Sequence, residues 1–285
     1  MSKATLLFCL LVFPVSNLLS QQKEFPKHTG PYLGQKPPGI TPEIFAPGII
    51  SSINFIEDVC TWSPDLKEFY FSRSEKFESE WTANFAIWYT REVNGIWIEP
   101  RLVPFSGVYR DFCPFVTRDG KYMIFYRMNN EKNKTRQGSW ITEKIGEWWS
   151  EPIFFVDAYC LNTNDFNTFY FTTEKDENGT RDIGFMLYEN GKFSEKIKLK
   201  GELNTKEYEA HGVISPNGEY ILFDGDDYTL VSFKQQDGTW SRGISLNAFY
   251  YLPSFSPDGK YIFFKKDRDI YWVSTRIIDE VKPKE

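Results

Sequence analysis

Residues 250–264 read Tyr-Tyr-Leu-Pro-Ser-Phe-Ser-Pro-Asp-Gly-Lys-Tyr-Ile-Phe-Phe. An apolar segment leads into Ser256-Pro257-Asp258-Gly259, and a second segment, rich in aromatic residues, runs from Tyr261 to Phe264. A proline followed by Asp-Gly between two apolar segments is a strong signal for a tight turn. The stretch therefore predicts a β-hairpin.

This hairpin pattern recurs along the chain. Clear copies occupy residues 57–71, 111–125 and 209–223, and a weaker copy occupies residues 157–171. A period of about 40–55 residues built from short strands is typical of the blades of a β-propeller. The turn residue of the five copies falls at Asp65, Asp119, Asp165, Asn217 and Asp258.

A second repeated signal predicts how many strands each unit has. A Gly followed closely by an aromatic residue, as in Asn94-Gly95-Ile96-Trp97, occurs late in the first four units and starts a further strand. The last unit lacks this strand, but residues 42–50 are strand-like and resemble the missing piece. We therefore predict an all-β fold, a five-bladed β-propeller of four-stranded antiparallel blades, whose last blade is closed by the N-terminal strand. Such closure protects a strand edge from aggregation.

The repeats carry a family resemblance. Phe255-Ser256-Pro257-Asp258-Gly259 and the strand after it resemble the WD40-like PD40 repeat, which occurs in the propeller of the periplasmic protein TolB and in many exported bacterial proteins. The resemblance covers nearly all of residues 42–276. The chain departs from the family at Leu66 and Phe166, which stand where the family has Gly. The resemblance implies a fold and leaves the function open.

The two ends of the chain differ from the repeats. Residues 1–20 combine Lys3 with an apolar run that is too short to span a bilayer, which predicts a secretory signal cut near Ser20. Residues 21–41 form a Pro/Gly-rich leader, expected to be extended and poorly packed, and residues 277–285 form a C-terminal tail. The predicted location is periplasmic or secreted, without stable membrane insertion after cleavage.

The net charge of the chain limits the classes of molecule that it is expected to bind. The chain has 285 residues, a formal net charge of −6 and no basic cluster. An acidic surface repels nucleic acid and anionic membranes, so we expect neither as a partner. We expect a monomer that meets a protein or a polysaccharide in the cell envelope or outside the cell.

Three cysteines remain once the signal segment is removed: Cys60, Cys113 and Cys160. An odd number in an exported protein allows at most one internal disulfide. In the repeat alignment Cys60 and Cys160 take the same position and Cys113 lies one residue earlier. We expect all three to be small buried residues on innermost strands that react slowly with thiol reagents.

One constellation emerges when the repeats are aligned. Four units carry an acid six residues before the Ser or Thr of the turn, and the fifth carries a tyrosine at that place. Because innermost strands line the channel of a propeller, these positions predict a ring at one mouth of the channel. The proposed ligand-binding residues are the ring itself with two neighbours: Glu57, Asp111, Asp157, Glu209 and Tyr250, beside Arg110 and His211.

Three functions fit this ring. The first is a non-catalytic binding or protein-interaction module that uses the channel mouth. The second is a carbohydrate-active hydrolase, which would need two carboxylates in different environments, although no catalytic residue can be assigned. The third is a structural component of an envelope assembly. No cofactor and no protein metal site is predicted, and a cation bound in the channel is the alternative way to offset the acids. Equally, each acid could hold backbone N–H groups at a junction between blades.

Overall fold

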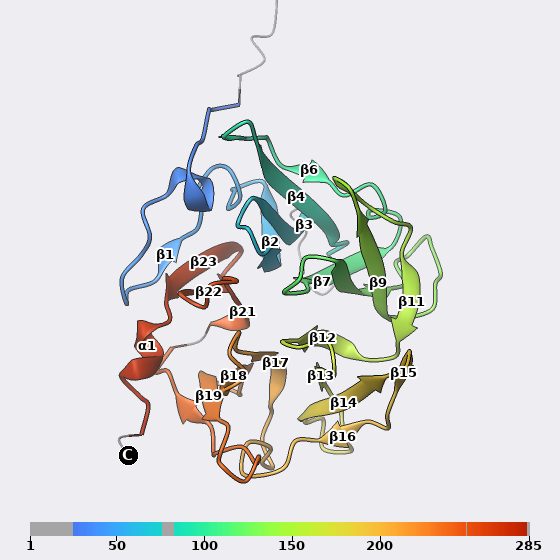
Figure 1. Ribbon diagram of the computed structural model, residues 1–285, viewed down its shortest axis with the longest axis vertical. Helices are drawn as coiled ribbons and strands as arrows, with labels where there is room; N and C mark the ends of the chain where they lie inside the picture. The colour runs from blue at the N-terminus through green and yellow to red at the C-terminus, as the bar shows by residue number, and fades with distance from the viewer. Residues whose placement is uncertain (1–24, 76–82, 249, 284–285) are drawn as a thin grey trace, which may run out of the picture.

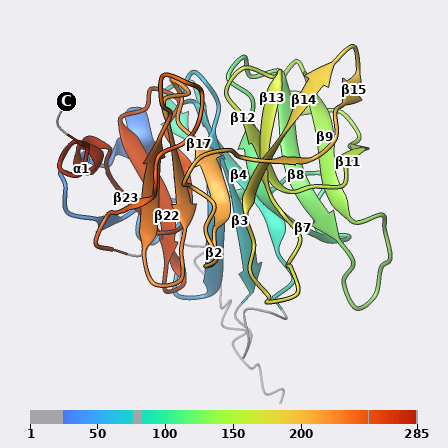
Figure 2. The same cartoon turned by 90° about the horizontal axis from the view of Figure 1, so that it is seen from below.

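Five antiparallel sheets stand around a central axis in the computed structural model (Figure 1). The structure describes residues 25–75, 83–248 and 250–283. Seen from the side, the strands run between the two faces of a disc (Figure 2). The predicted five-bladed β-propeller is therefore confirmed.

The first three blades share one plan, in which the outermost strand is split into two short pieces that both pair with the third strand. Their strands, from the axis outward, are as follows: β2 (Phe55–Trp62), β3 (Glu68–Glu75), β4 (Ala86–Val93), β5 (Ile96–Trp97) and β6 (Arg101–Leu102); β7 (Arg110–Val116), β8 (Tyr122–Met128), β9 (Gly138–Ile145), β10 (Trp148–Trp149) and β11 (Ile153–Val156); β12 (Tyr159–Thr163), β13 (Thr168–Thr172), β14 (Ile183–Glu189), β15 (Lys192–Phe193) and β16 (Ile197–Lys198).

The last two blades have four strands each. The last blade takes its outermost strand from the N-terminal part of the chain, as predicted: Glu43 pairs with Trp272, and Ile44 pairs with Tyr271. The strands are as follows: β17 (Ala210–Ile214), β18 (Tyr220–Asp224), β19 (Thr229–Phe233) and β20 (Ile244–Ser245); β21 (Tyr251–Phe255), β22 (Tyr261–Lys266), β23 (Asp269–Ser274) and β1 (Glu43–Ile44).

The hydrophobic core lies between the blades. Each of five clusters of buried side chains joins two neighbouring blades of the described chain. The cluster that joins the last blade to the first is the most aromatic. In it, Phe45 is fully buried and contacts Trp62, Phe69, Phe263 and Trp272 at ring-centroid distances of 5.1–5.8 Å. The segment that closes the ring thus also fills the core.

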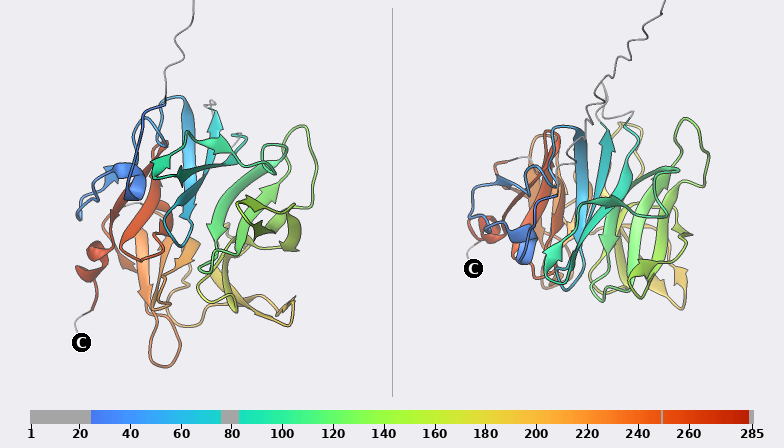
Figure 3. Two further views of the ribbon diagram at one scale, coloured as in Figure 1. Left: turned by 45° about the horizontal axis from the view of Figure 1, so that its top comes forward. Right: turned by 90° about the horizontal axis from the view of Figure 1, so that it is seen from above.

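The leader is better packed than its composition predicts. Its short 3₁₀ helix η1 (Pro31–Gly34) buries Tyr32 and Leu33 against the last and first blades, and the N-terminal segment follows the last blade in Figure 3. The expectation of poor packing is wrong here because two apolar side chains stand among the prolines and glycines. The tail begins as helix α1 (Arg276–Asp279), which buries Ile277 and Ile278.

The aspartates of the repeated turns have the structural role that their sequence context indicates. The hydroxyl of Ser63 donates to Asp65, that of Thr117 donates to Asp119, and that of Ser256 donates to Asp258, at 2.6–2.7 Å. These bonds fix the turn between the first and second strands of a blade.

The predicted signal segment, residues 1–20, lies outside the described residues. In the part of the chain that is described, no helix has both the length and the apolar character needed to cross a bilayer.

Candidate binding site in the central channel

Every innermost strand contains a β-bulge. The register of pairing shifts by one residue between Phe112 and Phe115 in β7, and at the corresponding place in the other four innermost strands. In four blades one bulge residue has a left-handed backbone, with φ between 52° and 54°. A bulge re-aims side chains and lets successive residues face the same way. These four residues are Cys113, Cys160, His211 and Leu252, and all of them line the channel.

Two of the predicted ring acids form ion pairs inside their own blades. Glu57 and Asp111 are both fully buried. Nε of Arg73 donates to Glu57 at 3.1 Å, and Nε and Nη2 of Arg127 donate to Asp111 at 2.7 and 3.0 Å. Burial raises the pKa of Glu57 to about 7, although the charge of Arg73 opposes the shift. These carboxylates therefore hold the blades together and do not face the mouth of the channel.

The other predicted ring members are also dispersed. Glu209 is buried and accepts hydrogen bonds from the hydroxyl and the backbone N–H of Thr205. Asp157 is exposed to solvent. Tyr250 is buried, with its ring 4.2 Å from that of Phe264. The predicted ring of carboxylates at the mouth is thus replaced by separate local interactions.

The physical reason is the two-residue period of a strand. Side chains alternate between the faces of a sheet, so a shift of one residue exchanges the inner and outer sets. The residue after each predicted ring position is the one that lines the mouth in three blades: Asp58, Phe112 and Tyr251. In the third blade the lining residue is Tyr159, two positions after Asp157.

A cavity of about 300 Å³ occupies this mouth, where the innermost strands begin. We call it the mouth cavity. Among the predicted site residues, Arg110 lines it. Its lining includes three cations and five aromatic residues: Arg110, Arg181, Lys265, Phe85, Phe112, Tyr126, Tyr159 and Tyr251.

Each cation of the mouth cavity lies over an aromatic ring. The guanidinium carbon of Arg110 is 5.4 Å from the centroid of Phe112, that of Arg181 is 5.4 Å from Tyr159, and Nζ of Lys265 is 5.8 Å from Tyr251. Distances within about 6 Å allow a cation–π attraction. The same lining also holds two carboxylates, Asp58 and Glu174, and Asp58 lies 3.9 Å from Nζ of Lys265. Three positive and two negative groups leave the cavity wall positive, in contrast to the acidic chain as a whole.

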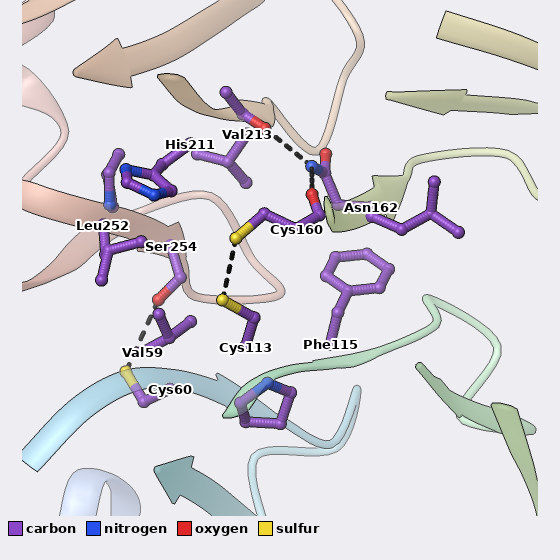
Figure 4. Close-up of a pocket in the computed structure, with 14 residues that line it drawn as sticks. Val59, Cys60, Cys113, Phe115, Cys160, Asn162, His211, Val213, Leu252 and Ser254 are labelled. Atoms are coloured by element: carbon purple, nitrogen blue, oxygen red, sulfur yellow. Dashed lines mark hydrogen bonds between the residues drawn. The ribbon is translucent and has the colours of Figure 1, made fainter. Parts of the chain in front are cut away.

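Next to the mouth cavity lies a smaller cavity of about 50 Å³, which we call the waist of the channel; Figure 4 shows the side chains that line it. Leu252 lines both the mouth cavity and the waist, and Phe115 lines both the waist and the opposite mouth, which is formed by the repeated turns. The mouth cavity, the waist and the opposite mouth therefore follow one another along the axis. The waist is lined by the bulge residues Cys113, Cys160 and His211.

A chain of hydrogen-bonding groups runs from the waist into the blades. Nδ1 of His211 lies 2.7 Å from Oδ2 of Asp224, and its Nε2 lies 3.2 Å from the hydroxyl of Tyr159. Burial alone would lower the pKa of His211, but the hydrogen bond to Asp224 together with the charges of Cys160 and Asp224 raises this pKa above the usual value. The predicted site residue His211 thus lies at the waist, away from the predicted acids.

Metal binding has no support from geometry in the ranges that the structure covers, where no three His, Cys, Asp or Glu side chains are grouped to hold an ion. The cation considered from the sequence stays an untested prediction.

Comparisons with known proteins show only distant likeness. No protein-family model matches the chain, and no curated protein matches its sequence. Among solved structures, a putative TolB from Agrobacterium tumefaciens is 15% identical over 77% of each chain, with a TM-score of 0.49. A gluconolactonase from Xanthomonas campestris is 11% identical over 87% of this chain and 97% of its own, with a TM-score of 0.48.

A third structure, a puromycin-hydrolysing peptidase from Mycobacterium tuberculosis, is 13% identical over 76% of this chain and 35% of its own, with a TM-score of 0.45. Likenesses this distant carry no argument about ligand or reaction. Function has to be argued from the side chains of the channel.

The residues of the mouth cavity left a weak signal in the sequence. Aromatic residues follow the ring position at Phe112 and Tyr251, and Lys265 stands opposite Tyr251 in the hairpin. A repeat alignment that allowed for the bulge would have selected these residues as the ones that line the channel. Arg181 lies in the connection before β14, where the repeat alignment has no counterpart for it.

Proposed function

We propose that this protein is an exported, non-catalytic binding module that takes a small anionic ligand into the mouth cavity. The observation that carries the proposal is the set of three cations, each lying over an aromatic ring, around one cavity of about 300 Å³. Pockets that bind small molecules start at about this size and combine apolar walls with a few convergent polar groups.

The chemistry of the wall favours an acidic sugar as the ligand. Guanidinium groups bind carboxylates strongly through charge-assisted hydrogen bonds. Aromatic faces offer apolar contact to the C–H face of a sugar ring, and a tyrosine adds a hydroxyl. A single acidic sugar, or the acidic end of a polysaccharide, would use both features. This choice agrees with the polysaccharide partner expected from the sequence.

A carbohydrate-active hydrolase is the second candidate, and one observation favours it. Asp58 and Glu174 both line the mouth cavity, and Asp58 is buried while Glu174 is exposed. Two carboxylates in unequal environments are what an acid and a base or nucleophile require. The structural role in an envelope assembly requires no ligand at all.

The test is a binding screen combined with an assay for turnover. Thermal shift and isothermal titration would compare glucuronate and galacturonate, free and as short oligomers, with the matching neutral sugars. We expect the acidic sugars to bind, less tightly as salt rises, without release of new reducing ends. Equal affinity for neutral and acidic sugars, or no binding to any of them, would contradict the proposal. Sugar release that is lost in both Asp58→Asn and Glu174→Gln would favour the hydrolase.

Export is a separate part of the proposal and rests on residues 1–20 and on the resemblance of the repeats to PD40 proteins. Expression of the full chain in a bacterium, followed by N-terminal sequencing of the mature protein, tests it. We expect a start just after Ser20 and a periplasmic or secreted product. An uncleaved chain in the cytoplasm would contradict it.

A further inference from the structure

Two thiols meet at the waist of the channel. Cys113 of β7 and Cys160 of β12 come from neighbouring blades, and their sulfur atoms lie 2.8 Å apart (Figure 4). This is only about 0.8 Å more than the length of a disulfide bond, which is about 2.05 Å. Both residues occupy the bulge position, with φ of 52°. The equivalence of the two bulges brings the side chains to the same level of the channel.

This pairing corrects the alignment made from the sequence. There Cys60 and Cys160 were equivalent, whereas the bulge makes Cys113 and Cys160 equivalent. Cys60 also lines the waist, but it packs in the aromatic cluster between the last and first blades, with its sulfur 3.5 Å from the hydroxyl of Ser254. Burial raises the pKa of Cys60 to about 12. For Cys60 we therefore still expect a buried thiol that reacts slowly with thiol reagents.

Cys160 is the accessible member of the pair. It is half-buried, whereas Cys113 is 6% exposed and Cys60 is 2% exposed. The residue before it, Tyr159, lines the mouth cavity. Phe112, the residue before Cys113, lines the mouth cavity as well. The greater exposure of Cys160 therefore makes it the thiol that a small molecule reaches more readily.

The surroundings of Cys160 favour its thiolate. Burial alone would raise its pKa, but a hydrogen bond from Cys113, the charge of His211 and a hydrogen bond from Tyr159 lower it below the usual value for a thiol. Burial and the proximity of Cys160 raise the pKa of Cys113. The two thiols therefore differ: Cys160 loses its proton more readily than Cys113 does. This asymmetry is typical of reactive dithiols.

We propose that Cys113 and Cys160 form a redox-active pair that closes a reversible disulfide across the waist by exchange with a small disulfide that enters through the mouth cavity. The Cys160 thiolate attacks one sulfur of that disulfide, forms a mixed disulfide and releases one thiolate. The Cys113 sulfur then attacks Cys160, closes the internal bond, gives up its proton and releases the second thiolate. The small disulfide is reduced by two electrons and the protein dithiol is oxidised by two.

His211 acts here as a positioning residue. Its Nδ1 is held by Asp224 and its Nε2 faces the hydroxyl of Tyr159, so the ring is fixed beside Cys160. His211→Asn should slow the reaction of Cys160 and leave that of Cys60 unchanged.

The experiment is a redox titration of the folded protein with mixtures of oxidised and reduced glutathione. Intact-mass and peptide mapping should show a reversible loss of two hydrogen atoms and a single Cys113–Cys160 disulfide. Cys60→Ser is the matched control and should keep the transition, whereas Cys113→Ser should stop at a mixed disulfide on Cys160. A bond that thiols cannot reduce in the native state, or no Cys113–Cys160 bond at any ratio, would overturn the proposal.

A second measurement uses the wild-type protein, so that its result does not depend on whether a variant folds. Alkylation of the reduced wild-type protein by iodoacetamide, followed residue by residue, should modify Cys160 at least about tenfold faster than Cys60. His211→Asn should remove most of that difference while circular dichroism stays native. Equal rates for Cys60 and Cys160 in the wild type would contradict the assignment of Cys160 as the nucleophile.

Discussion

Two blades use the same buried ion pair. Arg73 follows Glu57 by sixteen residues, and Arg127 follows Asp111 by the same number. Arg73 also donates to the backbone carbonyl of Ile50, and Arg127 donates to that of Phe105. Each arginine therefore fastens the first two strands of its blade to the segment that arrives from the preceding blade. Glu57 and Asp111, two of the four acids that were predicted to form a binding ring, therefore connect neighbouring blades.

Removal of one partner from such a pair should be costly. Asp111→Ala leaves the guanidinium of Arg127 buried without its carboxylate, which typically lowers the free energy of unfolding by about 3–5 kcal/mol. Asp157→Asn, at the exposed member of the predicted ring, should change it by less than about 0.5 kcal/mol. Urea denaturation of both variants measures this. Comparable losses in the two variants would contradict the assignment of Asp111 as a structural joint.

Glu57 should make stability depend on pH. Its pKa is raised to about 7 because it is buried, whereas the unfolded chain has an ordinary glutamate with a pKa of about 4.3. The folded state therefore holds a proton that the unfolded state loses, and stability falls as pH rises from about 4.3 to about 7. Glu57→Gln should flatten this part of the curve of unfolding free energy against pH. An unchanged slope in the variant would show that Glu57 is already ionised in the folded state.

At the scale of elements, ring closure depends on a two-residue strand. β1 is only Glu43–Ile44, so two residues of pairing cannot by themselves hold the last blade closed. The fully buried side chain of Phe45, which follows directly, supplies the packing. Closure is thus a matter of core packing more than of strand pairing.

Phe45→Ala should therefore destabilise the whole fold. Loss of a fully buried phenylalanine typically lowers the free energy of unfolding by about 3–5 kcal/mol. Ile40→Ala, in the same segment but 45% exposed, should have little effect. Thermal melts of both variants provide the check, and a Tm for Phe45→Ala equal to that of the wild type would argue against closure by this segment.

The elements that repeat were predictable, and those that do not repeat were not. The turn signals such as Ser256-Pro257-Asp258 predicted the hairpin between the first two strands of each blade, and the missing fourth strand predicted closure by residues 42–50. The burial of Tyr32 and the split outermost strands were missed because they occur outside the repeat signal. The site was missed by one residue in most blades, because the bulge in each innermost strand cannot be seen in a pattern of residue types. Phe112 and Asp111 are neighbours in the sequence but belong to the channel and to the blade joint, respectively.

At the scale of the whole molecule, the channel has two different ends. The mouth cavity holds Arg110, Arg181 and Lys265 over aromatic rings. The opposite mouth is built from turns and holds Arg118, which donates to the backbone carbonyl of Pro216. Arg181 likewise donates to a backbone carbonyl, that of Thr173, at 2.6 Å. Arg181 and Arg118 therefore make the same kind of hydrogen bond at opposite ends of the channel. Substitution of each one tests which end binds the ligand.

The most direct test of ligand binding at the mouth cavity is titration calorimetry of the best acidic sugar from the screen with Arg181→Gln and Arg118→Gln. A hydrogen bond to a charged group contributes about 1.5–3 kcal/mol, so Arg181→Gln should weaken binding about tenfold or more. Arg118→Gln should bind like the wild type. Equal affinity in all three proteins, or a loss confined to Arg118→Gln, would contradict binding at the mouth cavity.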